Sequence, residues 1–276
     1  MKSHLSLVLV FLGLCGCTWQ TSTAVPTSIN THPNETAATP SPSPSPTLRE
    51  ELALNNGLRI TRQNVEMENR DWRYKIDVDY PEIEGSNDPA IRSLNLEIKR
   101  LVRKTYSWPL NRPTKKDLTY YAKWTDVYNS VDMEYDVVLA NDELLSIYFV
   151  GYHYGIGAAH SVHKSFTINY DLKSHRTLTL GDLFQPGAKY LEVISRRCID
   201  TLSKDDRYVK EQPQVDYLLP KFKNFGSWNV TGRGLRFNFD SCTVKSCAAG
   251  DLTVEIPFNE LRGLLKPDGA LRIGGV

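Results

Sequence analysis

The sequence feature that most constrains this chain is a short apolar run near its start, because the run indicates the compartment in which the rest of the chain folds. Lys2 precedes the run Leu5–Leu14, which is broken only by Ser6 and Gly13. About ten apolar residues suit the hydrophobic region of a signal peptide, whereas a membrane-spanning helix needs about 20. We therefore expect the folded part of the chain to lie beyond the cytoplasmic membrane.

The residues that follow this run match the lipobox of bacterial lipoproteins. Leu14 is the aliphatic residue, Gly16 the small residue, and Cys17 the cysteine that receives diacylglycerol. Cys15 fits less well, because the bulky Leu14 would then precede the cleavage site. The sequence predicts a signal peptide over residues 1–16 and acyl chains on Cys17 that anchor the protein in the lipid bilayer. The protein would then face the periplasm or the exterior; an ordinary cleaved signal peptide is the alternative.

Residues 17–53 are expected to form a disordered, lipidated linker. They are rich in Thr, Ser, Pro and Asn, and proline alternates with serine from Pro40 to Pro46. Such a stretch buries too little apolar surface to offset the entropy of ordering, and alternating proline favours an extended chain.

The remainder has the pattern of an α+β fold. Residues 72–80 alternate large and polar side chains, as a half-buried strand does. Asp88 and Pro89 are a helix start, because an aspartate caps free N–H groups and proline suits the first helical position. A second helix is expected over residues 186–203, between further strands. We expect a twisted antiparallel sheet, or sheets, with the two main helices packed on one face.

Charge and cysteine content narrow the function classes. The 33 basic and 32 acidic residues nearly cancel, which argues against a nucleic-acid partner. A basic cluster near the end of the first helix, Lys99 to Lys104, is either a solvated helix face or a contact for an anionic partner.

The cysteines predict one disulfide. Outside the cytoplasm disulfides are stable, and Cys242 and Cys247 are the preferred pair. Cys198 is expected to be buried in the second helix.

Three histidines are the main candidates for chemistry. His153, His160 and His163 fall within eleven residues, and imidazoles are good zinc ligands. Their spacing is not that of the helical His-Glu-x-x-His motif, so they are weak metal candidates and no cofactor is expected. The chain lacks a Gly-x-Ser-x-Gly motif as well. An enzyme is therefore the less favoured interpretation; the alternative is a cell-wall hydrolase or deacetylase-like enzyme that uses these histidines.

Several motifs carry a family resemblance. These are Tyr152–His160, Phe166–Leu172, Leu178–Phe184, Cys247–Gly250 and Val254–Phe258. Together they resemble the extracytoplasmic domain family of the anti-sigma factor RsiV. The preceding part resembles the companion domain found in front of the catalytic domain of the peptidoglycan deacetylase PdaC. The resemblance implies an α+β subdomain over residues 54–150 and an RsiV-like domain over 151–276.

For one family member the resemblance also implies recognition of lysozyme. That member's loop carries Pro-Tyr where this chain has Ser246 and Cys247. We expect a non-catalytic binding module of the cell envelope, whose ligand is a protein such as lysozyme or a peptidoglycan glycan. The candidate binding residues lie in two loops: Tyr152, Tyr154, Gly155, Gly157, His160, Cys247, Ala248, Ala249 and Gly250.

Overall fold

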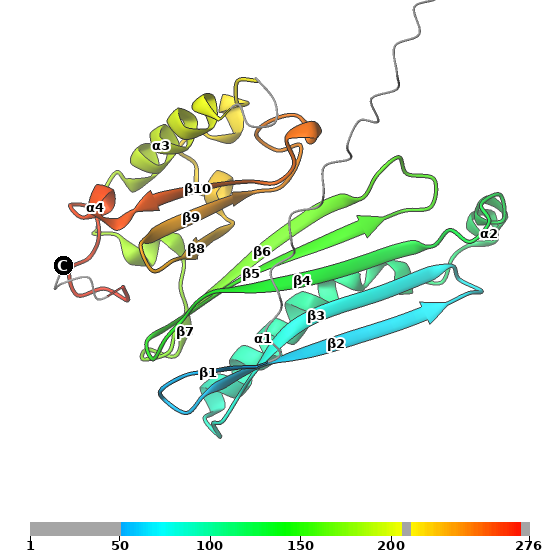
Figure 1. The fold of residues 1–276 in the computed structure, drawn as a ribbon, viewed down its shortest axis with the longest axis horizontal. Coiled ribbons are helices and arrows are strands. Elements are labelled where there is room, and N and C mark those ends of the chain that lie inside the picture. The colour runs from blue at the N-terminus through cyan, green and yellow to red at the C-terminus, as the bar shows by residue number, and fades with distance from the viewer. Residues whose placement is uncertain (1–50, 206–210, 272–276) are drawn as a thin grey trace, which may run out of the picture. The chain divides into compact units, whose positions relative to one another are not determined.

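A computed structural model describes residues 51–205 and 211–271 (Figure 1). It contains a seven-stranded sheet, a three-stranded sheet and four α-helices, which confirms the predicted α+β class. The predicted signal peptide, Cys17 and linker residues 17–50 lie outside the described residues. Within the described part of the chain, no helix has both the length and the apolar character needed to cross a membrane.

The large sheet follows the order of the chain. Its strands are β1 (Glu51–Ala53), β2 (Arg59–Asn69), β3 (Tyr74–Glu84), β4 (Asn129–Ala140), β5 (Leu144–Tyr154), β6 (Val162–Asp171) and β7 (Arg176–Thr177). Neighbouring strands are antiparallel except β3 and β4, which are parallel because a helical crossover joins them. Glu51–Ala53 was expected in the linker, but it pairs with β2, so this part of the predicted linker is ordered.

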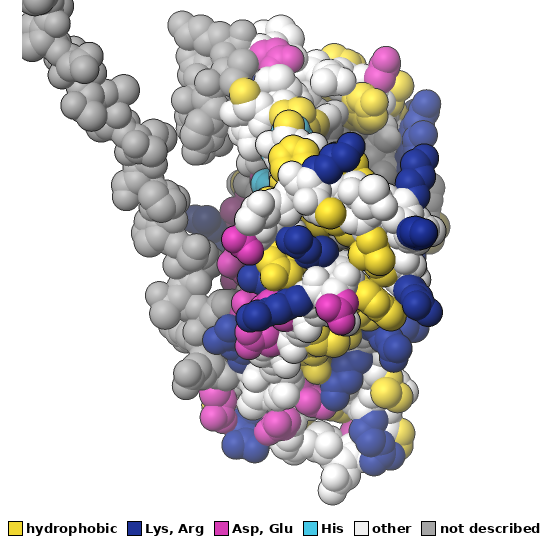
Figure 2. Space-filling view, turned by 90° about the vertical axis from the view of Figure 1, so that its right-hand side faces the viewer, with side chains coloured by type: hydrophobic (Ala, Val, Ile, Leu, Met, Phe, Trp, Pro, Cys, Tyr) yellow, Lys and Arg dark blue, Asp and Glu magenta, His cyan; other side chains and the backbone are white. Residues whose placement is uncertain are grey.

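Helix α1 (Pro89–Tyr106) begins where the sequence predicts. Asp88 accepts a hydrogen bond from the Ala90 N–H at 2.7 Å. The buried side of the helix, with Leu94 and Ile98 at its centre, shares a core with the sheet residues Ile76 and Phe149. The crossover continues through η1 (Trp108–Leu110) and α2 (Lys115–Tyr121). Figure 2 views this end of the large sheet, where Lys and Arg side chains line one edge.

The small sheet has its own helix. Its strands are β8 (Trp228–Val230), β9 (Gly234–Phe239) and β10 (Leu252–Pro257), in the order β10-β9-β8. Helix α3 (Tyr190–Lys204) packs on this sheet through Ile194, Cys198 and Leu202. Burial raises the pKa of the Cys198 thiol to about 12. The two main helices thus cover two different sheets, one each (Figure 1).

Shorter helical elements complete this half of the chain. They are η2 (Leu180–Leu183), η3 (Val215–Tyr217), η4 (Phe222–Phe225), η5 (Cys247–Ala249) and α4 (Phe258–Leu261).

Buried polar side chains join the two sheets. The Ser146 hydroxyl of β5 donates to Asn169 Oδ1 of β6 at 2.7 Å, and Asn169 Nδ2 donates to the Trp228 carbonyl at 2.8 Å. Asn229 Nδ2 of β8 donates to Ser146 Oγ at 2.9 Å.

The predicted subdomain boundary at 150/151 falls within a strand. Residue 150 lies inside β5, so the large sheet continues across this boundary.

Candidate functional site

The connection between β5 and β6 depends on one of the two predicted glycines. The Ala158 N–H donates to the Gly155 carbonyl at 2.9 Å, and Gly157 has φ +87°, as the third residue of a type II turn requires. A Cβ at Gly157 would lie 2.0 Å from the Tyr120 hydroxyl. A Cβ at Gly155 would meet no atom within 4 Å, so of the two glycines only Gly157 is required by a close approach.

A side chain that the sequence did not single out holds this loop. Asn129, the first residue of β4, is buried, and its Oδ1 accepts a hydrogen bond from the Ile156 N–H at 2.9 Å. His160, a candidate binding residue in the same connection, is exposed, and its Nδ1 lies 2.9 Å from the carbonyl of the adjacent Ser161.

The three histidines have three separate partners. His153 accepts a hydrogen bond from the Trp108 indole N–H at 3.0 Å, His160 contacts Ser161, and His163 contacts Asp251. Burial lowers the pKa of His153, and the charge of Lys164 lowers it further. Within residues 51–205 and 211–271, no group of three His, Cys, Asp or Glu side chains could hold a metal ion.

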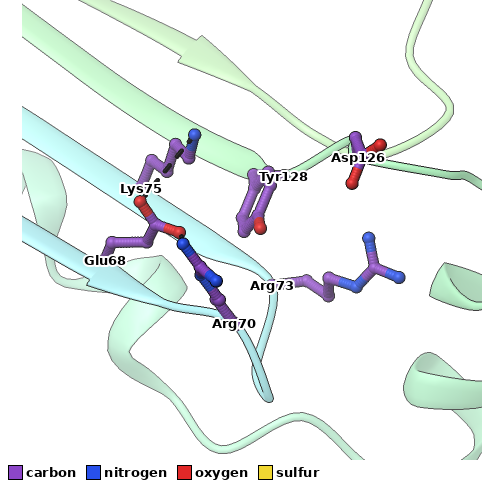
Figure 3. Close-up of a pocket in the computed structure, with 6 residues that line it drawn as sticks. All are labelled: Glu68, Arg70, Arg73, Lys75, Asp126 and Tyr128. Atoms are coloured by element: carbon purple, nitrogen blue, oxygen red, sulfur yellow. Dashed lines mark hydrogen bonds and ion pairs between the residues drawn. The ribbon is translucent and has the colours of Figure 1, made fainter.

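A pocket of about 500 Å³ lies beside the turn between β2 and β3 (Figure 3). Arg70, Arg73 and Lys75 contribute three cations to its lining, with Glu68, Asp126 and Tyr128. The Lys75 ammonium lies 4.4 Å from the centre of the Tyr128 ring. Glu68 forms ion pairs with Arg70 at 3.1 Å and with Lys75 at 3.8 Å. No motif marks this turn, so the sequence does not identify Arg70, Arg73 and Lys75 as a group.

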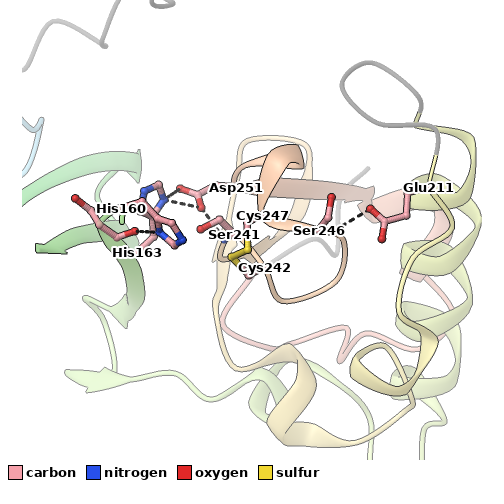
Figure 4. The surroundings of a disulfide bond; sticks show 9 residues. His160, His163, Glu211, Ser241, Cys242, Ser246, Cys247 and Asp251 are labelled. Atoms are coloured by element: carbon pink, nitrogen blue, oxygen red, sulfur yellow. Dashed lines mark hydrogen bonds and ion pairs between the residues drawn. A yellow bond between two sulfur atoms is a disulfide. The ribbon is translucent and has the colours of Figure 1, made fainter. Parts of the chain in front are cut away.

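The structure contains the Cys242–Cys247 disulfide (Figure 4). Inside the closed loop, Val244 is buried in the small-sheet core and the Lys245 amine bonds to the Asp205 carbonyl. The Ser246 N–H donates to Glu211 Oε2 at 3.0 Å. The bridge therefore holds a loop with a fixed shape against the end of α3.

The four residues Cys247–Gly250 at the end of the disulfide loop differ in exposure. Ala249 packs in the small-sheet core, and Gly250 has φ +69°. Cys247 and Ala248 are exposed. Of the four residues predicted in this loop, Cys247 and Ala248 can meet a partner, whereas Ala249 and Gly250 shape the turn.

His163 and Asp251 bring the two candidate loops together (Figure 4). Nδ1 of His163 lies 3.0 Å from Oδ1 and 3.1 Å from Oδ2 of Asp251. Asp251 Oδ1 also accepts a hydrogen bond from the Ser241 N–H at 2.8 Å. Both loops are predicted from the sequence, whereas Asp251, which directly follows the Ala248–Gly250 segment, is not.

Tyr152 lies at the centre of this junction. It pairs in register with Asp132 of β4 on one side and with His163 of β6 on the other. The Tyr152 and His163 rings meet edge to face with centres 4.7 Å apart. Burial raises the pKa of Tyr152, and the charges of Glu134 and Asp251 raise it further, so its hydroxyl stays protonated as a hydrogen-bond donor.

This face carries side chains that form hydrogen bonds. Alternate residues of a strand share one face, so Asp132 and Glu134 point to the same side as Tyr152 and both are exposed. Carboxylates accept hydrogen bonds from hydroxyl and amide groups, and a tyrosine presents both a ring and a donor. We call Asp132, Glu134, Tyr152, His163 and Asp251 the junction surface.

Solved structures define the fold class. A DUF3298 family protein from Pseudomonas aeruginosa PAO1 matches with a TM-score of 0.52 and 17% identity, over 75% of this chain and 94% of that one. A DUF3298 family member from Bacteroides fragilis NCTC 9343 matches with a TM-score of 0.51 and 13% identity, over the same shares. The fold is therefore that of the DUF3298 structures.

Sequence comparison divides the chain into two matched segments. Residues 67–163 match the family model described as Deacetylase PdaC, and residues 181–259 match Protein of unknown function (DUF3298). The chain thus contains a PdaC/DUF3298-like domain. It is 27% identical over 202 residues to the peptidoglycan-N-acetylmuramic acid deacetylase PdaC of Bacillus subtilis (strain 168). That alignment covers 62% of this chain and 42% of the relative.

Proposed function

We propose that this chain is a lipid-anchored protein of the cell envelope whose junction surface binds cell-wall glycan without catalysing a reaction. The observation that carries the proposal is the contact between His163 and Asp251, 88 residues apart. It joins the glycine loop and the disulfide loop beside Tyr152. The predicted acylation of Cys17 would keep this surface close to the wall.

Peptidoglycan suits the chemistry of the junction surface. Its sugars carry hydroxyl and amide groups that the exposed Asp132 and Glu134 can bind, and apolar ring faces that can lie on an aromatic side chain. The similarity to a protein named as a peptidoglycan deacetylase also supports a ligand from the wall. Because the three histidines have separate partners, the proposal assigns them no catalytic role.

Co-sedimentation with insoluble peptidoglycan tests the proposal. We expect the full chain to be retained, and Tyr152→Ala to lower the affinity at least tenfold. Tyr217→Ala is the matched control, because Tyr217 is 52% exposed and lies outside the junction surface. Unfolding curves of both variants show whether a loss of binding reflects a loss of fold. Equal retention of the two variants, or none of the wild-type chain, would contradict the proposal.

Two further measurements address the partner and the anchor. Pull-down with lysozyme asks whether the exposed Cys247 and Ala248 bind a protein ligand instead of glycan. Retention on lysozyme that Tyr152→Ala does not affect would favour the protein ligand.

Labelling with palmitate tests the anchor: we expect label on the wild-type chain and none on Cys17→Ser. Absence of label on the wild-type chain would remove the anchor from the proposal.

A further inference from the structure

A strongly basic segment lies in the crossover between β3 and β4 and shares no residue with the junction surface. Residues 100–124 contain seven Lys and Arg and one Asp, a net charge of +6 in a chain whose formal net charge is +1. The single Asp117 is engaged in the cap of α2, where it accepts from the Thr114 N–H at 2.8 Å. The charge of the chain is therefore unevenly distributed, although its total is near zero.

The same segment exposes apolar side chains. Four of the nine large exposed hydrophobic residues of the described chain lie in it: Trp108 (37% exposed), Leu118 (38%), Tyr120 (42%) and Trp124 (37%). Figure 2 faces this end of the molecule and shows hydrophobic side chains between those of Lys and Arg. We call residues 100–124 the basic aromatic surface.

Contacts anchor Trp108 and the backbone at Trp124 to the large sheet and to its β2–β3 turn. The Trp108 indole donates to His153 at 3.0 Å, and the Tyr120 and Trp124 rings meet edge to face with centres 6.5 Å apart. Arg73 donates to the Trp124 carbonyl at 3.3 Å. Trp108 and the segment around Trp124 are therefore anchored, which lowers the ordering entropy that binding of a partner has to offset.

The cations of the basic aromatic surface have no carboxylate partner in the described part of the chain. Within the described residues, none of the seven basic side chains of residues 100–124 forms an ion pair; Lys123 lies over the Tyr120 ring instead, at 5.8 Å. Arg73, which lines the pocket beside Tyr128 (Figure 3), adds a further cation at the Trp124 carbonyl.

We propose that the basic aromatic surface docks on a bilayer of anionic phospholipid. Trp and Tyr side chains favour the headgroup level of a bilayer, and each Lys or Arg near an anionic leaflet adds about 1 kcal/mol. Leu118 favours a bilayer over an anionic polymer, because an aliphatic side chain gains from acyl chains but offers no ring to a sugar. This docking depends neither on glycan binding at Tyr152 nor on the acylation of Cys17.

Vesicle co-sedimentation of the full chain tests the docking. Every version carries Cys17→Ser, so that no acyl chain on that residue contributes. We expect stronger binding to phosphatidylglycerol-containing vesicles than to pure phosphatidylcholine vesicles. The triple variant Lys104→Gln, Lys115→Gln, Lys116→Gln should lower the affinity for the anionic vesicles about 100-fold, from three charges at the surface. Leu118→Asn should lower it several-fold.

The control removes three exposed charges elsewhere. Arg196→Gln, Lys221→Gln, Lys223→Gln has the same charge change on the α3 and η4 side of the chain and should bind as the wild type does. Equal binding of the two triple variants, or equal binding to neutral and anionic vesicles, would overturn the proposal. An unchanged Leu118→Asn, or binding to soluble dextran sulfate without binding to vesicles, would overturn it in favour of a polyanion.

Discussion

The imidazole of His163 lies 3.0 Å from the carboxylate of Asp251, and this contact connects the two sheets of the protein at their exposed edge. His163 belongs to β6 of the large sheet, and Asp251 immediately precedes β10 of the small sheet. Both side chains are about 30% exposed, at 27% and 31%. Ligands can therefore reach a pair that also fixes the spacing of two loops.

Asp251→Asn should affect binding more than stability. Exposed ion pairs contribute about 0–1 kcal/mol, so the free energy of unfolding should fall by no more than about 1 kcal/mol. Peptidoglycan affinity should fall at least fivefold, because the disulfide loop loses its contact with β6. Asp216→Asn changes the same charge on an exposed residue of η3 and should leave both quantities unchanged. A large loss of stability without a change in affinity would show that the pair is purely structural.

Gly157→Ala should destabilise the protein by about 2 kcal/mol or more. The left-handed φ of +87° disfavours an L side chain, and the added Cβ would meet the Tyr120 hydroxyl. Gly155→Ala is the matched control two residues earlier, where the space is open, and should have a much smaller effect. Denaturant unfolding measures both. Equal effects at the two glycines would mean that the turn does not require Gly157.

Asn169→Ala should destabilise the protein by about 3 kcal/mol. Asn169 is 3% exposed and exchanges hydrogen bonds with Ser146, the Trp228 carbonyl and the Val230 N–H. Removal of its amide leaves several buried polar groups without partners, each at a cost of about 1–3 kcal/mol. Asn87→Ala, at an exposed position, should change the unfolding free energy by less than about 0.5 kcal/mol. A cost near zero at Asn169 would mean that the sheets do not depend on this network.

His153 should make the protein less stable in mild acid. Burial lowers its folded pKa, so the unfolded chain binds the proton more tightly. The stabilisation is complete above the unfolded pKa of about 6.5 and is lost as the pH falls through the lower folded pKa. Protonation of Nδ1 would also remove the acceptor for Trp108.

Unfolding free energies measured at pH 7.5 and pH 5 give the size of this effect. His153→Gln should remove part of the loss that the wild type shows in acid, whereas His160→Gln, at an exposed histidine, should not. The same pH dependence in all three proteins would exclude His153 as its source.

Local signals in the sequence predict much of the fold. Asp88 and Pro89 correctly marked the start of α1, and the alternation in residues 72–80 marked β3, because capping and strand periodicity depend on nearby residues. The parallel pairing of β3 with β4 was not predicted, since it depends on how the crossover through α1 returns to the sheet. Leu52 lies in a stretch expected to be linker, yet it pairs with Ile60 and packs on the large-sheet core.

The candidate site was predicted only in part. The sequence identified the loops around Gly157 and Cys247 but not Asn129 or Asp251, which hold them. These two residues act across 27 and 88 positions of the chain, and such contacts leave no periodic pattern in one sequence. The sequence places Tyr120 and Trp124 in a run of aromatic residues, but whether such side chains are exposed depends on the completed fold.

Hydrogen–deuterium exchange in the presence of soluble peptidoglycan fragments tests the central claim most directly. If the junction surface binds the glycan, amide exchange should slow in residues 150–165 and 241–252 together, and Tyr152→Ala should abolish this protection. Fragments that bind without slowing exchange in either segment, or that protect only segments elsewhere in the chain, would contradict the claim.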